Sequence, residues 1–161
     1  MNTEPQKEHE WLKKFVGEWT AEGEAPLEPG KPPVKWKSAE TVRSLGGLWV
    51  VCEGRGEMPE GGGASTTVMT LGYDPQKKRY VGTWVGSMMH HLWVYDGSVD
   101  PAGKVLTLDT VGPSFSGDGT MAKFQDVMEF KSDDHRVLTA RVQGPDGKWT
   151  EMMTVHYHRT K

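Results

Sequence analysis

The sequence predicts an all-β protein: a single antiparallel up-and-down β-barrel of about ten strands with a short N-terminal helix. Three observations support this prediction. Apolar and polar residues alternate over most of the chain, the alternating segments are rich in Val, Thr, Trp and Tyr, and short turns containing Pro, Gly and Asp separate them. A length of 161 residues suits one core, so we expect one domain over residues 1–161.

The helix is expected over about residues 7–16. Trp11, Leu12 and Phe15 have the spacing of one helix face, and acidic residues open the segment, where they favour a helix N-terminus. Gly17 is expected to end the helix.

From Trp19 onward the apolar period changes to two, which is the period of a half-buried strand. Boundaries predicted from a pattern are accurate to about two to four residues. The predicted strands are 18–24, 34–43, 47–56, 65–73, 79–87, 89–96, 104–111, 122–131, 136–143 and 149–158.

The connections between these segments predict how the strands pair. Residues 74–78, 100–103 and 145–147 each contain the Pro and Asp or Gly of a tight turn, and they are too short for crossover helices. Sequence neighbours should therefore pair antiparallel, and closure into a barrel would remove the exposed edges. A two-sheet sandwich is the alternative. The Gly-rich segments 59–63 and 112–119 are expected to be loops, and the second is long enough for a lid over the barrel mouth.

Composition and charge exclude several classes of function. Lys and Arg number 19 and Asp and Glu number 22, so no positive excess exists for binding nucleic acid. The longest apolar run, 48–52, is far shorter than the roughly 20 residues of a membrane helix, and the N-terminus lacks a signal-peptide core. We expect a cytoplasmic protein. The lone Cys52 provides neither a disulfide nor a CxxC metal site.

A titratable residue on an inward, otherwise apolar strand face is a candidate functional residue. Asp126 alternates with Phe124 and Met128, and a carboxylate there is costly unless it is paired or solvated inside a pocket. The alternative is a position near the barrel rim, bonded to backbone.

A second candidate lies in segment 84–95. His90 and His91 are adjacent and must point to opposite faces of a strand, so at most one faces the barrel interior. His91 would share its face with Trp93, but alternation alone does not choose between the two histidines. A hydrogen-bonded core histidine is the alternative.

The last predicted strand contains a third candidate. His156 and His158 are two residues apart, hence on one face, and could bind a metal or ligate haem iron. No third ligand has a recognisable spacing, and exposed imidazoles are the alternative.

Several motifs resemble the bacterial domain-of-unknown-function family 1579. They are segments 42–49, 70–75, 81–84, 91–97 and 147–149. That family is similar to the lipocalin-like, or calycin, barrels, so the resemblance implies the fold without implying a reaction. It places at family motif positions Ser87, Met88, His91, Asp109, Phe124, Asp126 and Trp149.

A remoter resemblance is to nitrobindin-type barrels, which hold haem through a histidine near the end of the chain. Gly17, Trp19 and Gly23 partly match their N-terminal pattern, and the resemblance implies His156 or His158 as the haem ligand.

The leading hypothesis is a non-enzymatic barrel, without a cofactor, that holds a small hydrophobic or amphipathic molecule. A small enzyme using His91 as general base with Asp126, a haem protein and a homodimeric interaction protein are the alternatives. The residues predicted to contact the ligand are Trp84, Met88, His91, Trp93, Asp109, Phe124, Asp126 and Met128.

Overall fold

The computed structural model describes residues 3–26, 28–58 and 62–161. Within them the chain forms a helix, a 3-10 turn and ten strands. These are α1 (Lys7–Leu12), η1 (Lys13–Phe15), β1 (Gly17–Ala25), β2 (Val34–Leu45), β3 (Trp49–Glu57), β4 (Ala64–Asp74), β5 (Arg79–Gly86), β6 (Trp93–Val99), β7 (Val105–Pro113), β8 (Met121–Ser132), β9 (His135–Gln143) and β10 (Trp149–Arg159).

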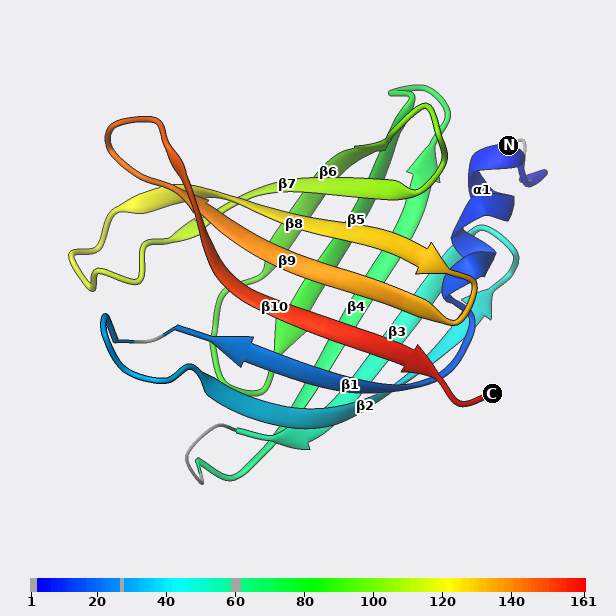
Figure 1. Ribbon diagram of the computed structural model, residues 1–161. Coiled ribbons are helices and arrows are strands. Elements are labelled where there is room, and N and C mark those ends of the chain that lie inside the picture. Colours follow the sequence, from blue (N-terminus) through cyan, green and yellow to red (C-terminus); the bar gives the residue numbers. More distant parts are fainter. Residues whose placement is uncertain (1–2, 27, 59–61) are drawn as a thin grey trace.

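The strands form a closed antiparallel barrel in which each strand pairs with its sequence neighbours (Figure 1). The last strand, β10, returns to pair with β1, where Trp19 lies opposite Arg159. The predicted barrel is therefore confirmed, and none of the ten described strands is left with an unpaired edge, as it would be in the alternative sandwich.

One predicted strand begins later than expected. Residues 87–92 leave the ladder and β6 starts only at Trp93. The chain turns after Gly86, where the Met89 amide donates to the Gly86 carbonyl oxygen (3.3 Å) and the Ser87 hydroxyl accepts from the Thr66 amide (3.0 Å). This local hydrogen bonding overrides the alternation that predicted a strand.

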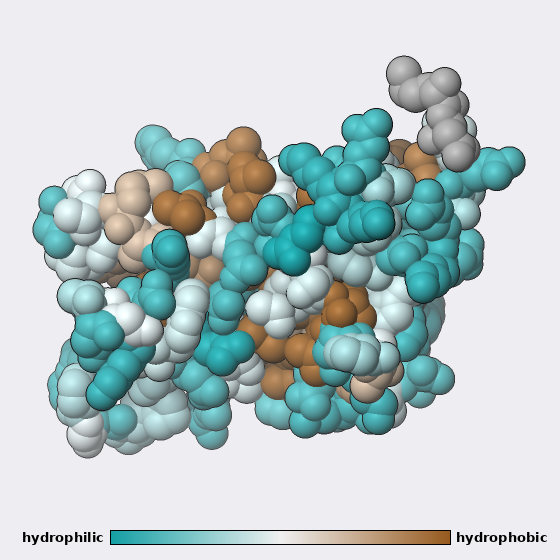
Figure 2. Space-filling model, turned by 90° about the horizontal axis from the view of Figure 1, so that it is seen from above, coloured by the Kyte–Doolittle hydropathy of each residue, from teal (hydrophilic) through white to brown (hydrophobic). Residues whose placement is uncertain are grey.

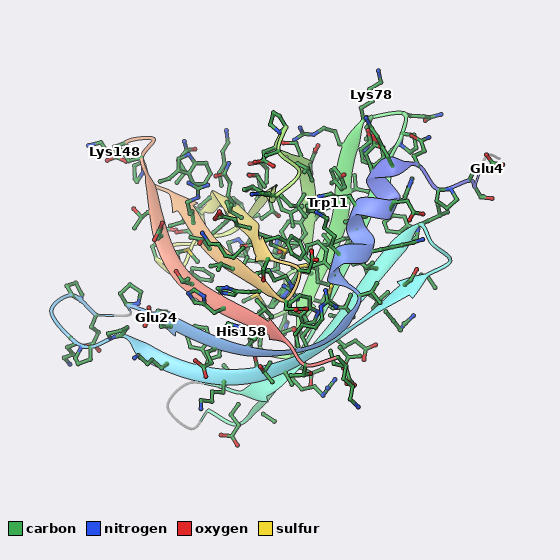
Figure 3. All side chains as sticks on the ribbon, turned by 45° about the vertical axis from the view of Figure 1, so that its right-hand side comes forward. Glu4, Trp11, Glu24, Lys78, Lys148 and His158 are labelled. Atoms are coloured by element: carbon green, nitrogen blue, oxygen red, sulfur yellow. The ribbon has the colours of Figure 1, made fainter. Side chains whose placement is uncertain are left out.

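The helix closes one end of the barrel. The Trp11 indole nitrogen donates to the carbonyl oxygen of Gly103 (2.7 Å), and a ring nitrogen of His9 lies 3.1 Å from the carbonyl oxygen of Tyr73. Figure 3 shows Trp11 between the helix and the strands, with Lys78 and Lys148 at opposite ends of the barrel. The turns after β2, β4, β6 and β8 lie at this closed end, as do the first described residues and the C-terminus.

Apolar side chains fill the closed half. Phe15 and Phe130 pack edge to face, with their ring centroids 5.0 Å apart. Leu71, Leu106 and Leu108 are fully buried. Since these groups pack beneath the helix, the hollow part of the barrel lies toward the opposite, open end.

Loops at the open end border the hollow part. They join β1 to β2, β3 to β4, β5 to β6, β7 to β8 and β9 to β10. Of the predicted lid loop 112–119, residues 112 and 113 belong to β7, and the rest forms a loop closed by a bond from the Ser114 amide to the Thr120 carbonyl oxygen (2.8 Å). The loop predicted at 59–63 lies partly outside the described residues.

Candidate functional site

The open half of the barrel contains a cavity of about 360 Å³. Every strand except β1 contributes to its wall, and most of the wall is apolar. Phe15 from the helical cap lies at its inner end, and Met88, Met89 and Phe115 from the open-end loops lie at its mouth. The cavity is thus enclosed on its sides and inner end and accessible between loops.

Four neighbouring strands, β5 to β8, provide an aromatic and thioether wall. It includes five of the predicted ligand contacts, namely Trp84, Met88, Trp93, Phe124 and Met128, with Met88 just beyond β5. Trp84 lies opposite Trp93 in the β5–β6 register, and Trp93 packs edge to face on Phe124 with centroids 5.0 Å apart. Such a wall suits flat or flexible apolar groups.

Gly112 fixes the position of the Trp93 ring. A Cβ atom at this residue would lie 2.1 Å from the indole, so a larger side chain would displace the ring. The Trp93 indole nitrogen also donates to the Met89 sulfur, at 3.0 Å. Both contacts hold the ring in the cavity wall.

Asp126 lies in the same wall, on the strand face of Phe124 and Met128. It accepts a hydrogen bond from the Tyr95 hydroxyl at 2.5 Å. Desolvation raises the pKa of the Asp126 carboxyl, and the Tyr95 hydrogen bond opposes this shift. Burial and the neighbouring Asp126 charge raise the pKa of Tyr95 well above its ordinary value. The hydrogen-bond partner of Asp126 is thus a side chain, whereas the alternative interpretation of the sequence expected a backbone group.

Thr110 lies beside this pair. It follows Asp109, which pairs with Asp96 across β6 and β7, so Thr110 and Tyr95 are neighbours on adjacent strands. The Thr110 residue is 8 % exposed and borders the cavity. Among the described residues its hydroxyl has no hydrogen-bond partner. Tyr95, Thr110 and Asp126 form a cluster of polar groups in the wall, hereafter the polar cluster.

A second polar group lies at the inner end of the cavity. The Arg136 guanidinium, 2 % exposed, forms an ion pair with Glu40. It also lies 4.6 Å from the Trp19 ring centroid and 3.9 Å from that of Tyr157. Burial, followed by the Glu40 charge, raises the pKa of Tyr157. Stacking and pairing compensate the buried Arg136 charge, which therefore has a structural role at this site.

The structure places His91 outside the interior cavity. A ring nitrogen lies 3.2 Å from the Val111 carbonyl oxygen, and the ring packs edge to face on Trp93. His91 lines a separate, more open hollow with His90, Pro113 and Phe115. Since it lies on the 87–92 loop, strand alternation does not apply to it. His91 and Asp126 are not brought together, so the general-base mechanism predicted for them lacks its geometry.

Asp109 also lies outside the cavity. Its side chain is on the outer surface of β7, where it accepts from the Gln125 amide nitrogen at 2.8 Å and lies 3.8 Å from the Arg79 guanidinium. Asp109, which was expected at the ligand from its family motif position, therefore does not line the interior cavity, and its neighbour Thr110 is the inward residue.

His156 and His158 point away from the interior, and Tyr157 between them faces the cavity. The predicted haem ligand on this strand is therefore not in a position to reach an interior haem. On the outer surface the two histidines stack with His135, whose ring nitrogen lies 3.0 Å from one of His156. Within residues 3–26, 28–58 and 62–161, no group of three or more His, Cys, Asp or Glu has the arrangement to hold a metal ion.

Sequence reasoning missed Glu40 and Arg136. Arg136 alternates with Leu138 and Ala140 on an apolar face, which is the same signal that identified Asp126. Its partner Glu40 is 96 residues away in sequence, so no local pattern could pair them.

Comparison with solved structures supports the fold. The chain is similar to Rv2717c from Mycobacterium tuberculosis, with a TM-score of 0.64 and 12 % identity over 98 % of this chain and 100 % of that one. It is also similar to the S-type phycobiliprotein lyase CPES from Guillardia theta, with a TM-score of 0.61 and 12 % identity over 94 % and 92 % of the two chains. None of the described helices is long and apolar enough to cross a membrane.

The sequence itself assigns the family. No curated protein matches the chain. A family model described as proteins of unknown function, DUF1579, matches residues 4–159, which is nearly the whole barrel and its helical cap. The chain therefore belongs to the DUF1579 family.

Proposed function

We propose that this protein binds a small, mainly apolar molecule inside the open half of its barrel. The cavity of about 360 Å³ carries the proposal, because it has the size, the enclosure and the apolar wall of a small-molecule site. Protein interiors are otherwise closely packed, and the closed half of this barrel is filled in that way.

The composition of the wall defines the class of ligand. Trp84, Trp93 and Phe124 offer flat apolar surfaces, whereas Met88 and Met128 offer flexible ones. The polar cluster provides a few hydrogen-bonding groups that would orient a guest. A hydrophobic or amphipathic molecule matches this combination better than a sugar or a nucleotide, which would require many polar partners.

The solved barrels contribute to the proposal only through their fold. One of them is titled a phycobiliprotein lyase, and the likeness of this chain to it is a likeness of architecture at 12 % identity. The proposal therefore depends on the cavity and its wall.

A cavity-filling variant tests the proposal. Ala140 lies in the wall, opposite Asp126 in the β8–β9 register, so Ala140→Phe would place a ring in the hollow. Thr139→Phe puts the same side chain on the opposite face of the same strand and is the matched control. The probe is N-phenyl-1-naphthylamine, which fluoresces when it enters an apolar site.

We expect wild type and T139F to bind the probe with similar dissociation constants, and A140F to bind at least about tenfold more weakly. Native mass spectrometry of the gently purified wild type would then identify any molecule that copurifies. A wild-type protein that leaves the probe dark, or an A140F protein that binds it normally, would contradict the proposal.

A further inference from the structure

Asp126 differs from the other charged residues buried along the cavity, because among the described residues no cation pairs with it. Glu40 is paired with Arg136. Arg55 and Glu57, near the mouth, have exposed side chains, and Arg55 donates to Thr41 on the outer surface. Among the described residues, Asp126 forms no ion pair with a Lys, Arg or His side chain. The enclosed wall thus contains one carboxylate without a countercharge.

The hydrogen-bonding capacity of the polar cluster is also largely unused. A carboxylate offers about four lone-pair sites, and Tyr95 occupies one, on Oδ2. Oδ1 of Asp126 has no hydrogen bond from the described part of the chain, and neither has the buried Thr110 hydroxyl. Buried polar groups normally have partners. Oδ1 of Asp126 is thus free to accept from a ligand, whereas the fully covered Thr110 hydroxyl could accept only after a rotation of its side chain toward the cavity.

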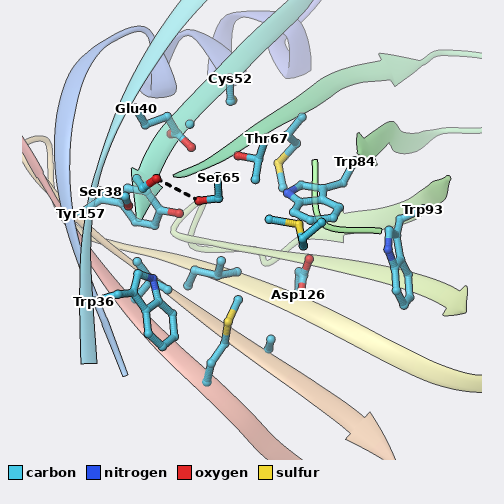
Figure 4. A pocket seen from close by; sticks show the side chains of 18 of the residues that line it. Trp36, Ser38, Glu40, Cys52, Ser65, Thr67, Trp84, Trp93, Asp126 and Tyr157 are labelled. Atoms are coloured by element: carbon cyan, nitrogen blue, oxygen red, sulfur yellow. Dashed lines mark hydrogen bonds between the residues drawn. The ribbon is translucent and has the colours of Figure 1, made fainter. Parts of the chain in front are cut away.

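Aromatic rings lie in the same part of the cavity wall as the carboxylate. Figure 4 shows Asp126 on the same side of the cavity as Trp84 and Trp93. Phe124 packs against Trp93 in the same wall. Ring faces attract a cation, most strongly where water is excluded, so these rings and the carboxylate favour the same sign of charge.

From these contacts we propose that the interior ligand presents a hydrogen-bond-donating, positively charged nitrogen to Asp126, attached to an apolar body. The ammonium or iminium group would donate to Oδ1 of Asp126 and to the Thr110 hydroxyl oxygen, and the apolar body would lie along the Trp84 and Trp93 rings. This inference rests on the proposed function and narrows it to apolar molecules whose nitrogen is protonated at neutral pH.

The Arg136 end of the cavity does not offer a strong site for an anionic ligand. Its guanidinium is paired with Glu40 and stacked on aromatic rings. Its Nε has no hydrogen-bond partner among the described residues, but this atom is covered and the side chain is only 2 % exposed. A carboxylate ligand would therefore gain little at that end, and it would be repelled by Asp126.

A series of naphthalenes of similar size tests the charge preference. The probes are 1-naphthylmethylamine, 1-naphthalenemethanol, 1-naphthoic acid and 1-methylnaphthalene, titrated by calorimetry at neutral pH and constant ionic strength. We expect the amine to bind at least about tenfold more tightly than 1-methylnaphthalene, since a hydrogen bond to a charged group is involved, and the acid to bind more weakly than either.

Two variants, each lacking one carboxylate, test whether the preference for the amine depends on Asp126. Asp126→Asn keeps the shape and an acceptor for Tyr95 but removes the charge, and should bring the amine within about threefold of 1-methylnaphthalene. Asp109→Asn removes a carboxylate from the outer surface and should leave all four affinities unchanged. Thr110→Val, which removes only the unpartnered hydroxyl, should weaken the amine about threefold and spare 1-methylnaphthalene.

The outcomes separate this inference from the proposed function. Binding of 1-methylnaphthalene with no preference for the amine, or an amine preference that survives both D126N and T110V, overturns the inference and leaves the binding function standing. Failure of all four probes to bind overturns both. If D126N does not fold, T110V alone decides.

Discussion

The Arg159 guanidinium lies over the Trp19 ring, 4.2 Å from its centroid, at the seam where the last strand pairs with the first. The same guanidinium donates to the backbone carbonyl oxygens of Val16, Lys14 and Asp133. One side chain therefore connects the helical cap, the β8–β9 turn and the closing strand pair.

Replacing Arg159 should open this junction. Arg159→Met keeps much of the apolar contact with Trp19 but leaves three carbonyl oxygens without their donor, so we expect a loss of about 2–3 kcal/mol in the free energy of unfolding. Urea denaturation measures it. The control is Arg43→Met, because Arg43 is exposed and forms only a long ion pair with Glu53, at 4.0 Å. This variant should lose less than about 0.5 kcal/mol in the free energy of unfolding. Equal losses in the two variants would contradict the role of Arg159.

The buried ion pair between Glu40 and Arg136 should be much more sensitive than a surface pair. Glu40→Ala leaves the Arg136 charge buried without its partner, which should cost about 3–5 kcal/mol. The double variant Glu40→Ala with Arg136→Met should recover part of that loss in urea denaturation, because no buried charge remains. Glu10→Ala, which breaks the exposed pair with Lys13, should cost less than about 1 kcal/mol.

Asp126 should make the protein less stable as pH rises. Its pKa is raised in the folded state mainly by desolvation, so above pH 3.8 the unfolded chain releases this proton before the folded protein does. The unfolded state then binds fewer protons, and the free energy of unfolding falls between pH 3.8 and the raised pKa. Asp126→Asn should remove this component of the pH dependence in denaturant titrations, whereas Asp109→Asn should retain it.

The His135 imidazole should titrate below its ordinary pKa of 6.5, because desolvation and then the charges of His158 and His156 disfavour its protonated form. As pH falls through 6.5, the unfolded state takes up this proton first, so stability is lost between 6.5 and the folded-state pKa. NMR titration of the ring protons measures the shift. Replacing both His156 and His158 by Gln should raise the His135 pKa part of the way, and a value at or above 6.5 in wild type would contradict the prediction.

Exposed apolar residues show where the alternation of apolar and polar residues is a weak guide to the inner face of a strand. Figure 2 shows hydrophobic patches among mainly hydrophilic residues on one face of the barrel. Val94, on β6, is 59 % exposed and Val111, on β7, is 52 % exposed. Apolar residues on the outer face blur the alternation that identifies the inner one. Asp126 was expected to face inward from its alternation with Phe124 and Met128, whereas Asp109 was expected at the ligand from its family motif position, which does not fix the face of a strand.

The all-β class, the approximate strand positions and the capping helix follow from periodicity and turn chemistry, because these act between residues close in the chain. The tertiary structure decided which groups meet. Tyr95 and Asp126 are 31 residues apart, on strands separated by β7, and come together only when the barrel curves. His91 lies outside the interior because the chain turns after Gly86 and the next strand begins only at Trp93. Side-chain partners across a barrel depend on register and closure, which are non-local, and a shift of a single residue reverses the face that a side chain occupies.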